Sequence, residues 1–188
     1  MTGNAPPVRT ASARMRPRDS LTGVPTSDAA SPATRALRRA RVPHTLLSYQ
    51  HEAGNRHFGQ EGADKLGRDP ATMFKTLVVS LQAGSARSPL AVAVVPVDRH
   101  LDLKAIAAAM GAKKAVMAAP EEAERATGYV VGGISPLGQR RTLPTCIDSS
   151  ALDHPTMIVS GGRRGLSVEL DPHDLVRLTN AVLAPVAA

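Results

Sequence analysis

Aromatic residues and cysteine are both scarce in this chain. Its 188 residues include two Tyr, two Phe and no Trp, so any core is built from Ala, Val, Leu and Met. Too few rings are present to stack along an extended single strand of nucleic acid. The single cysteine, Cys146, excludes an internal disulfide, a CxxC redox pair and a cysteine-rich zinc site, which is typical of a reducing compartment.

Long hydrophobic runs are absent as well. No stretch approaches the roughly 18 apolar residues of a membrane span, and the N-terminus lacks the continuous apolar segment of a secretory signal. We therefore expect a cytoplasmic protein with no membrane partner. A transit peptide is the alternative, because residues 1–30 are rich in Arg, Ser and Thr and poor in acids. These residues show no helical or strand period, so we expect a disordered N-terminal extension over residues 1–30 and one folded domain over residues 31–188.

Acidic residues are outnumbered. The chain has 23 Lys and Arg against 16 Asp and Glu, a formal net charge of +7. The extension carries four Arg and two Asp, so +2 belongs to it and +5 to the rest. A basic chain favours a polyanionic partner, and charge alone leaves RNA, DNA and an anionic membrane open.

The segment after residue 30 alternates helical and strand patterns. We expect helices at residues 32–41, 61–66, 103–110, 120–127 and 172–183, and strands at residues 45–49, 75–81, 90–95, 115–117, 145–148, 156–160 and 166–170. Two apolar runs separated by a short Gly/Ser loop, 75–81 and 90–95, predict a hairpin of central strands. Strands of both orientations with helices between them indicate an α+β fold around a mixed sheet.

Several catalytic motifs are each excluded by one position. Residues 133–137 fit G-x-S-x-G except at Leu137, and residues 51–55 fit H-E-x-x-H except at Asn55. Residues 161–165 lack the Lys-Ser/Thr pair of a Walker A loop. The six histidines show no ligand spacing, so we expect no metal and no other cofactor.

Three polar or glycine-rich segments at strand ends remain as candidates. Lys75 stands directly before an apolar strand, where its ammonium either points into a pocket or lies at an ordinary strand edge. Gly132 and Gly133 allow a tight loop whose N–H groups suit a carbonyl oxygen or an oxyanion, and a plain turn fits equally. The loop at residues 160–165 carries two arginines suited to phosphate or the RNA backbone, or is simply solvated.

Three further residues have a structural alternative. Cys146 lies in an apolar strand context, which favours a core position over a nucleophile. Tyr49 and Phe58 either line a small pocket or belong to the core.

Six stretches of the chain match one known family in order. They are Phe74–Val79, Leu101–Lys104, Met110–Lys114, Thr127–Gly138, Leu143–Pro144 and Ser160–Leu166. Across these stretches the sequence resembles the YbaK-type aminoacyl-tRNA deacylases, relatives of the editing domain inserted in bacterial prolyl-tRNA synthetase. The resemblance implies an α+β fold with a mixed, mostly antiparallel, barrel-like sheet surrounded by helices. It also implies hydrolysis of the ester that joins a misattached amino acid to the 3′ end of tRNA, with Cys-tRNA(Pro) as the usual substrate and Cys-tRNA(Cys) as a further candidate.

The resemblance also assigns roles to particular residues. The family's essential Lys falls on Lys75, and its G-x-x-x-P loop falls on residues 132–136, so Lys75 and Gly132 are the expected catalytic groups. The expected substrate-binding residues are Tyr49, Phe58, Thr76, Gly133, Ile134, Ser135, Pro136, Ser160, Gly161 and Gly162. Ser167 departs from the family pattern, because many relatives have an acidic or amide residue there, and no carboxylate role is expected at this position.

The implied chemistry agrees with the motifs that are missing. An aminoacyl ester is already activated, so positioning and charge stabilisation can supply most of the acceleration without a triad or a metal. The attacking group is either a water or the thiol of the substrate cysteine. The expected partners are the 3′ CCA end of an aminoacyl-tRNA and prolyl-tRNA synthetase.

Two other functions stay open from the sequence. One is an editing hydrolase for another small amino acid, such as Ala-tRNA(Pro) or Ser-tRNA. The other is a noncatalytic RNA-binding or regulatory module on the same fold. The presence of Lys75 and of the loop at residues 132–136 favours an enzyme over the binding module.

Overall fold

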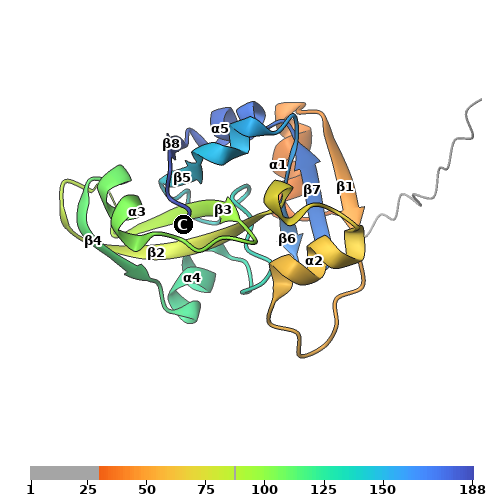
Figure 1. The fold of residues 1–188 in the computed structure, drawn as a ribbon, viewed down its shortest axis with the longest axis horizontal. Coiled ribbons are helices and arrows are strands. Elements are labelled where there is room, and N and C mark those ends of the chain that lie inside the picture. Colours follow the sequence, from red (N-terminus) through yellow and green to blue (C-terminus); the bar gives the residue numbers. More distant parts are fainter. Residues whose placement is uncertain (1–29, 87) are drawn as a thin grey trace, which may run out of the picture.

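The structure is a computed structural model that describes residues 30–86 and 88–188 (Figure 1). Residues 1–29 of the expected extension lie outside the described residues. The described residues form five α-helices: α1 (Pro32–Ala40), α2 (Phe58–Leu66), α3 (Leu103–Ala109), α4 (Pro120–Thr127) and α5 (Pro172–Thr179). Their strands are β1 (His44–Ser48), β2 (Phe74–Gly84), β3 (Leu90–Pro96), β4 (Ala112–Met117), β5 (Thr145–Asp148), β6 (Met157–Arg163), β7 (Leu166–Leu170) and β8 (Val182–Ala184).

The strands form two sheets. One has the order β1-β7-β6 and the other the order β4-β2-β3-β5-β8. Only the β3–β5 and β5–β8 pairs are parallel, so the α+β fold with mixed, mostly antiparallel pairing is confirmed. The two sheets meet at a bridge between Met73 and Ile158 and lie side by side in Figure 1. Among the described strands β4 and β8 form the edges of the larger sheet, which is therefore open and not a closed barrel.

The hairpin of central strands is confirmed and places the first candidate residue. β2 pairs with β3 in antiparallel register, with Lys75 opposite Val95 and Thr76 opposite Val94. Every residue of β3 is buried, as its continuous apolar sequence predicts. The start of β2 therefore lies where the larger sheet adjoins the smaller one.

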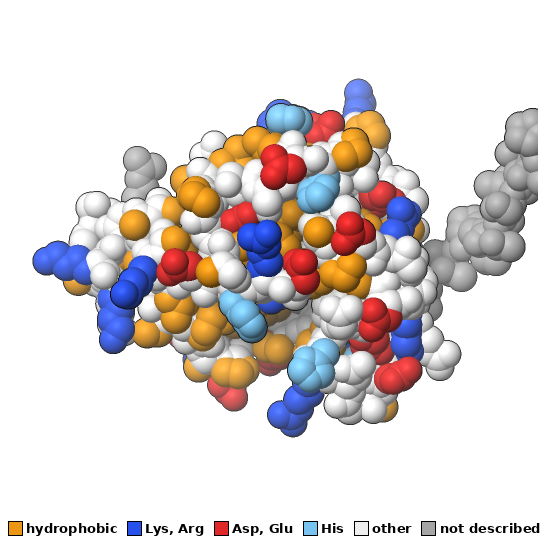
Figure 2. All heavy atoms as spheres, in the orientation of Figure 1, with side chains coloured by type: hydrophobic (Ala, Val, Ile, Leu, Met, Phe, Trp, Pro, Cys, Tyr) orange, Lys and Arg blue, Asp and Glu red, His pale blue; other side chains and the backbone are white. Residues whose placement is uncertain are grey.

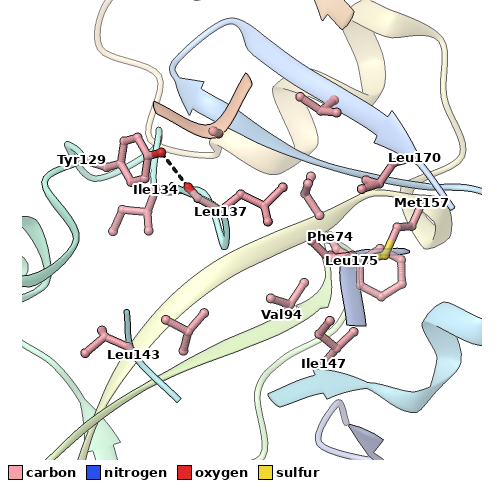
Figure 3. Close-up of a cluster of buried hydrophobic side chains, with 14 of the residues drawn as sticks. Phe74, Val94, Tyr129, Ile134, Leu137, Leu143, Ile147, Met157, Leu170 and Leu175 are labelled. Atoms are coloured by element: carbon pink, nitrogen blue, oxygen red, sulfur yellow. Dashed lines mark hydrogen bonds between the residues drawn. The ribbon is translucent and has the colours of Figure 1, made fainter. Parts of the chain in front are cut away.

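The core consists of small and aliphatic side chains, as the composition requires. Figure 3 shows its larger cluster, where Phe74 and Val94 of the hairpin lie between Leu170 and Met157 on one side and Ile134 and its neighbours on the other. Tyr129 is buried there and its hydroxyl donates a hydrogen bond to the Leu137 carbonyl at 2.7 Å (Figure 3). Cys146 is fully buried in the second cluster, which confirms its core position.

Cap signals fix the helix starts that the sequence predicts. Ser31 caps α1 through a capping box with Thr34, and Pro32 occupies the first turn. Asp102 caps α3 by accepting hydrogen bonds from two backbone N–H groups. The hydroxyl of Ser31 also donates to the Gly161 carbonyl, which ties the start of α1 to the end of β6.

The expected last helix was too long, and one strand was missed. Asn180 adopts a left-handed conformation with φ 49° and ends α5 at Thr179. The following residues form β8, which pairs with β5 over Cys146–Asp148. Helix α2 begins at Phe58, three residues before the expected start. The sequence does not mark this boundary, because the N-cap residue His57 makes no side-chain capping hydrogen bond.

Candidate active site

A cavity of about 470 Å³ opens where α2, the start of β2, the residue 131–134 loop and the β6–β7 hairpin meet. This volume lies in the range of small-molecule sites. Seven expected site residues line it: Tyr49, Phe58, Lys75, Thr76, Gly132, Ile134 and Ser160. Residues more than a hundred positions apart in the sequence thus share one cavity.

The other five expected site residues do not line the cavity. These are Gly133, Ser135, Pro136, Gly161 and Gly162. Ser135 is fully buried, and its carbonyl accepts a hydrogen bond from the Gln139 side chain. A β-carbon on Gly162 would lie 2.8 Å from the Tyr129 ring, so this glycine permits close packing. The role of these five residues in substrate binding stays a prediction.

Lys75 reaches the cavity from the first residues of β2. Its ammonium donates hydrogen bonds to the carbonyls of Val97, at 3.3 Å, and Arg99. An ammonium has three hydrogens, so one remains for a ligand. Burial lowers the pKa of Lys75 below its ordinary value, and the nearby charge of Asp98 partly opposes this.

The glycine-rich loop begins with a tight turn over residues 130–133. The Gly133 N–H donates to the Val130 carbonyl at 2.9 Å, and Gly132 has φ 85°, the pattern of a type II turn. The Val131 N–H is held by the Glu124 carboxylate at 2.8 Å. Among the described residues the Gly132 N–H has no hydrogen-bond partner, which leaves it as the donor that a substrate in the cavity can use.

Helix α2 packs directly on this turn. A β-carbon on Gly132 would lie 2.7 Å from three atoms of the Phe58 ring. A β-carbon on Gly133 would lie 2.9 Å from the backbone of Arg163, and the Ser160 hydroxyl donates to the Gly133 carbonyl at 3.1 Å. The turn is therefore fixed between α2 and the β6–β7 hairpin.

Two hydroxyl groups contribute polarity to the cavity wall. The Thr76 hydroxyl is buried and has no hydrogen-bond partner among the described residues. Such buried groups are normally paired, so a ligand atom is the partner that this geometry accommodates. Ser167 also lines the cavity and lies directly opposite Ser160 in the β6–β7 register.

A buried carboxylate stabilises the wall formed by α2. Glu61 is 4% exposed and accepts hydrogen bonds from His51 Nδ1 and the Glu52 N–H, each at 2.7 Å. Burial alone would raise the pKa of Glu61, but these two hydrogen bonds and the charge of Lys65 lower it below its ordinary value. Burial, together with the charge of Glu61, raises the pKa of Tyr49.

Several cavity residues were not expected from the sequence. Arg56, His57 and Gln60 come from a segment with no period, and Met117 and Val97 were read only as strand or loop positions. Met117 is 48% exposed at the cavity edge, an unusual position for a large apolar side chain. No local pattern marks these residues, because tertiary packing brings them together.

Residues 30–86 and 88–188 contain no group of three or more His, Cys, Asp or Glu side chains placed to hold a metal ion. Within the same ranges no helix has the length and apolar character needed to cross a bilayer.

Acidic and basic side chains are interspersed on the face shown in Figure 2, with basic groups projecting where β4 and the β2–β3 hairpin end.

Comparison with known proteins agrees with this site. A curated protein of Enterococcus faecalis strain ATCC 700802 / V583, named as a candidate Cys-tRNA(Pro)/Cys-tRNA(Cys) deacylase, EbsC, is 36% identical over 155 residues, which is 82% of this chain and 91% of that protein. A crystal structure described as a candidate trans-editing enzyme for prolyl-tRNA synthetase has a TM-score of 0.67 and 25% identity, covering 85% of this chain and 99% of the other. Another crystal structure, of a protein described as hypothetical, has a TM-score of 0.72 and 26% identity, covering 84% of this chain and 100% of the other.

The family assignment rests on the larger part of the chain. Residues 56–178 match the family described as the aminoacyl-tRNA editing domain. The matched segment contains α2, the hairpin, the 130–133 turn and the β6–β7 hairpin, which together enclose the cavity. Match and geometry lead to one conclusion: this chain belongs to the aminoacyl-tRNA editing domain family.

Proposed function

We propose that this chain is an aminoacyl-tRNA deacylase that removes cysteine from Cys-tRNA(Pro) and from Cys-tRNA(Cys). The observation that carries the proposal is one cavity that combines the Lys75 ammonium with the Gly132 N–H, which has no partner among the described residues. The identity of the amino acid follows the name of the E. faecalis relative.

The proposed roles follow from the hydrogen-bonding capacity of each group. The Gly132 N–H donates to the ester carbonyl oxygen, which becomes negatively charged as the tetrahedral intermediate forms. The third hydrogen of Lys75 contacts the ribose or phosphate of the terminal nucleotide and stabilises the developing charge. A water adds to the carbonyl carbon, the bond to the tRNA oxygen breaks, and that oxygen leaves with a proton. For cysteine the substrate thiol is the alternative attacking group.

Thr76, whose buried hydroxyl has no partner among the described residues, is the polar group that would bind the amino acid. Tyr49, Phe58 and Ile134 form apolar walls of the same cavity. A single methylene is worth only about 1–3 kcal/mol in such a pocket, so a synthetase for proline cannot fully reject amino acids of similar size. A separate hydrolase with its own pocket removes the error.

The test measures release of amino acid from purified Cys-tRNA(Pro), Cys-tRNA(Cys) and Ala-tRNA(Pro). We expect wild-type protein to release cysteine and the Lys75→Ala variant to be slower by about a hundredfold or more, because losing one oxyanion contact costs about 2.7–4 kcal/mol. Near-normal activity of Lys75→Ala would contradict its role. Release of alanine alone would leave the reaction in place and change the substrate, whereas no release from any tRNA would contradict the function.

Three further features belong to the same proposal. Prolyl-tRNA synthetase is the partner that would supply tRNA identity, supported by the description of the similar crystal structure. An arm of the assay with added synthetase tests this. We place the reaction in the cytoplasm, where a synthetase releases its products, and assign it to residues 31–188, so a variant lacking residues 1–29 should retain activity.

A further inference from the structure

Arg164 makes an unusual set of contacts for an exposed arginine. Its Nε and one terminal N–H both donate to the Val131 carbonyl, at 3.0 and 2.8 Å. Its guanidinium carbon lies 4.9 Å from the centroid of the Phe58 ring, within the range of a cation–π contact. One side chain thus connects the β6–β7 hairpin, the 130–133 turn and α2.

The carbonyl that Arg164 holds belongs to the central peptide of the turn. A trans peptide is planar, so its C=O and N–H point in opposite directions. The N–H on the other side of this peptide is that of Gly132, the free donor at the cavity. The orientation of the Val131 carbonyl therefore determines the direction of the Gly132 N–H.

The backbone of Gly132 does not by itself favour either orientation of the 131–132 peptide. Type I and type II turns differ by a flip of the central peptide, and only type II requires positive φ at the third residue. Gly132 adopts positive or negative φ about equally readily, so its own backbone does not select one form. A flipped peptide would direct a carbonyl oxygen, not an N–H, toward the substrate ester.

We propose that Arg164 is a positioning residue that locks the 131–132 peptide and keeps the Gly132 N–H directed at the substrate, an inference that rests on the proposed deacylase function. A guanidinium suits this role because it is planar: two of its N–H groups donate to the same carbonyl while its face packs on the Phe58 ring. Gly133 contributes by packing on the backbone of residues 163 and 164, which leaves no room for a β-carbon.

The competing role for Arg164 is binding of a tRNA phosphate. The two roles predict different kinetics. Loss of a phosphate contact raises KM and leaves kcat unchanged, whereas loss of the correctly directed N–H lowers kcat. Arg163 lines the cavity and its guanidinium makes no hydrogen bond to the described residues, so it fits a phosphate better than Arg164 does.

The experiment compares full-length wild type, Arg164→Ala, Arg164→Lys and the control Arg177→Ala. Arg177 is a surface arginine on α5, which contributes no residue to the cavity. Deacylation of Cys-tRNA(Pro) gives kcat and KM, and protein labelled with ¹⁵N-glycine gives the amide resonance of Gly132 without substrate. Thermal midpoints are measured for all variants.

We expect Arg164→Ala to lower kcat by about a hundredfold, the effect of misplacing a reacting group by about 1 Å. KM and the thermal midpoint should stay near the wild-type values, and the Gly132 amide resonance should shift. Arg164→Lys should stay impaired because a single ammonium lacks the fork. Added methylguanidinium should restore part of kcat to Arg164→Ala, and methylammonium should not.

Two results would overturn the proposal. One is a raised KM with unchanged kcat in Arg164→Ala, which would assign Arg164 to phosphate binding. The other is an unshifted Gly132 resonance in Arg164→Ala, whatever the kinetics. A wild-type protein that releases no amino acid would contradict the proposed function instead, and the Gly132 resonance would still decide whether Arg164 sets the turn.

Discussion

The Phe58 ring lies so close to Gly132 that a β-carbon at Gly132 would be 2.7 Å from three ring atoms. Gly132→Ala should therefore move either the ring or the turn, and it also strains φ 85°. We expect deacylation to fall by about a hundredfold or more, as for loss of an oxyanion donor. Release of cysteine from Cys-tRNA(Pro) by purified protein measures the effect.

A second glycine with positive φ separates the effect of backbone strain from that of the steric clash with Phe58. Gly54 has φ 91°, and a β-carbon there would contact nothing within 4 Å. Gly54→Ala should cost a similar backbone strain without a loss of activity. Equal activity of the two variants would contradict the role of the Gly132 turn.

The Lys75 ammonium should set an alkaline limit on activity. Burial lowers its pKa below the ordinary value of 10.5, so the group loses its proton at a lower pH than an exposed lysine does. The enzymatic rate, corrected for spontaneous ester hydrolysis, should therefore fall as pH rises toward 10.5. Lys75→Arg stays charged in this range and should lack the decline, even where its rate is lower. A Lys75→Arg profile identical in shape to that of the wild type would assign the decline to another group.

Glu61 should make the fold sensitive to acid. Its folded pKa lies below the ordinary value of 4.5, so its ionised form stabilises the fold above that pH and the stabilisation is lost as pH falls through the lowered pKa. Glu61→Gln should reduce the free energy of unfolding at pH 7 by about 1–3 kcal/mol, because charged hydrogen bonds within the wall are lost. Urea unfolding at pH 7 and at pH 4 checks this. The difference between wild type and variant should shrink at the lower pH, and a constant difference would contradict the assignment.

Local sequence was sufficient for most of the fold. Capping residues such as Ser31 and Asp102 marked helix starts, and the apolar runs at residues 75–81 and 90–95 marked the hairpin. Strand β8 was missed because a left-handed Asn180 ends α5 in the middle of an amphipathic pattern, and Asn tolerates both helix and cap. The pairing of β8 with β5 depends on contacts far apart in sequence, which no local pattern contains.

The residues of the candidate site were also predicted only in part. Lys75 and Gly132 were marked by polarity or glycine at strand and loop positions. Arg56 and Met117 were not, because they reach the cavity through tertiary packing. The sequence also does not reveal which backbone groups are hydrogen-bonded. In the structure the Gly133 N–H donates to the Val130 carbonyl, whereas the Gly132 N–H has no partner within the described ranges.

The arginines of α1 should carry much of the salt dependence of tRNA binding. Arg35, Arg38 and Arg39 lie in α1 and Arg41 is its C-cap; all four are exposed, and none forms an ion pair with the described residues. The N-cap residue of α1, Ser31, donates a hydrogen bond to the Gly161 carbonyl, next to the cavity residue Ser160. Helix α1 therefore adjoins the site, and a tRNA bound there can meet its cations. The double variant Arg38→Ala/Arg39→Ala should weaken binding and reduce the slope of log K against log salt by about 1–2.

A charge-matched control is available for this helix. Arg68 and Arg177 each pair with a carboxylate, Glu169 and Asp174 respectively. The double variant Arg68→Ala/Arg177→Ala removes the same formal charge from other elements and should leave the slope near the wild-type value. Equal slopes for the two double variants would show that α1 has no special contact with tRNA.

Thr76 offers a test in which activity and stability should separate. Its buried hydroxyl has no partner among the described residues, so replacing it by the nearly isosteric valine removes an unsatisfied polar atom. Thr76→Val should leave the free energy of unfolding unchanged or raise it by up to about 1–3 kcal/mol, the desolvation penalty of such a group. Deacylation should nevertheless slow, because the substrate loses a hydrogen-bond partner.

Thr127 provides the contrasting case with the same substitution. Its hydroxyl is buried, donates to the Ala123 carbonyl at 2.8 Å and accepts from the Tyr129 N–H. Thr127→Val should therefore destabilise the protein by about 1–3 kcal/mol, because the Tyr129 N–H loses its acceptor. It should retain activity at temperatures where it is folded, since Thr127 lies outside the cavity. A stable and fully active Thr76→Val would mean that the orphaned hydroxyl is not a substrate contact, and the polar recognition of the amino acid would pass to Ser160 and Ser167.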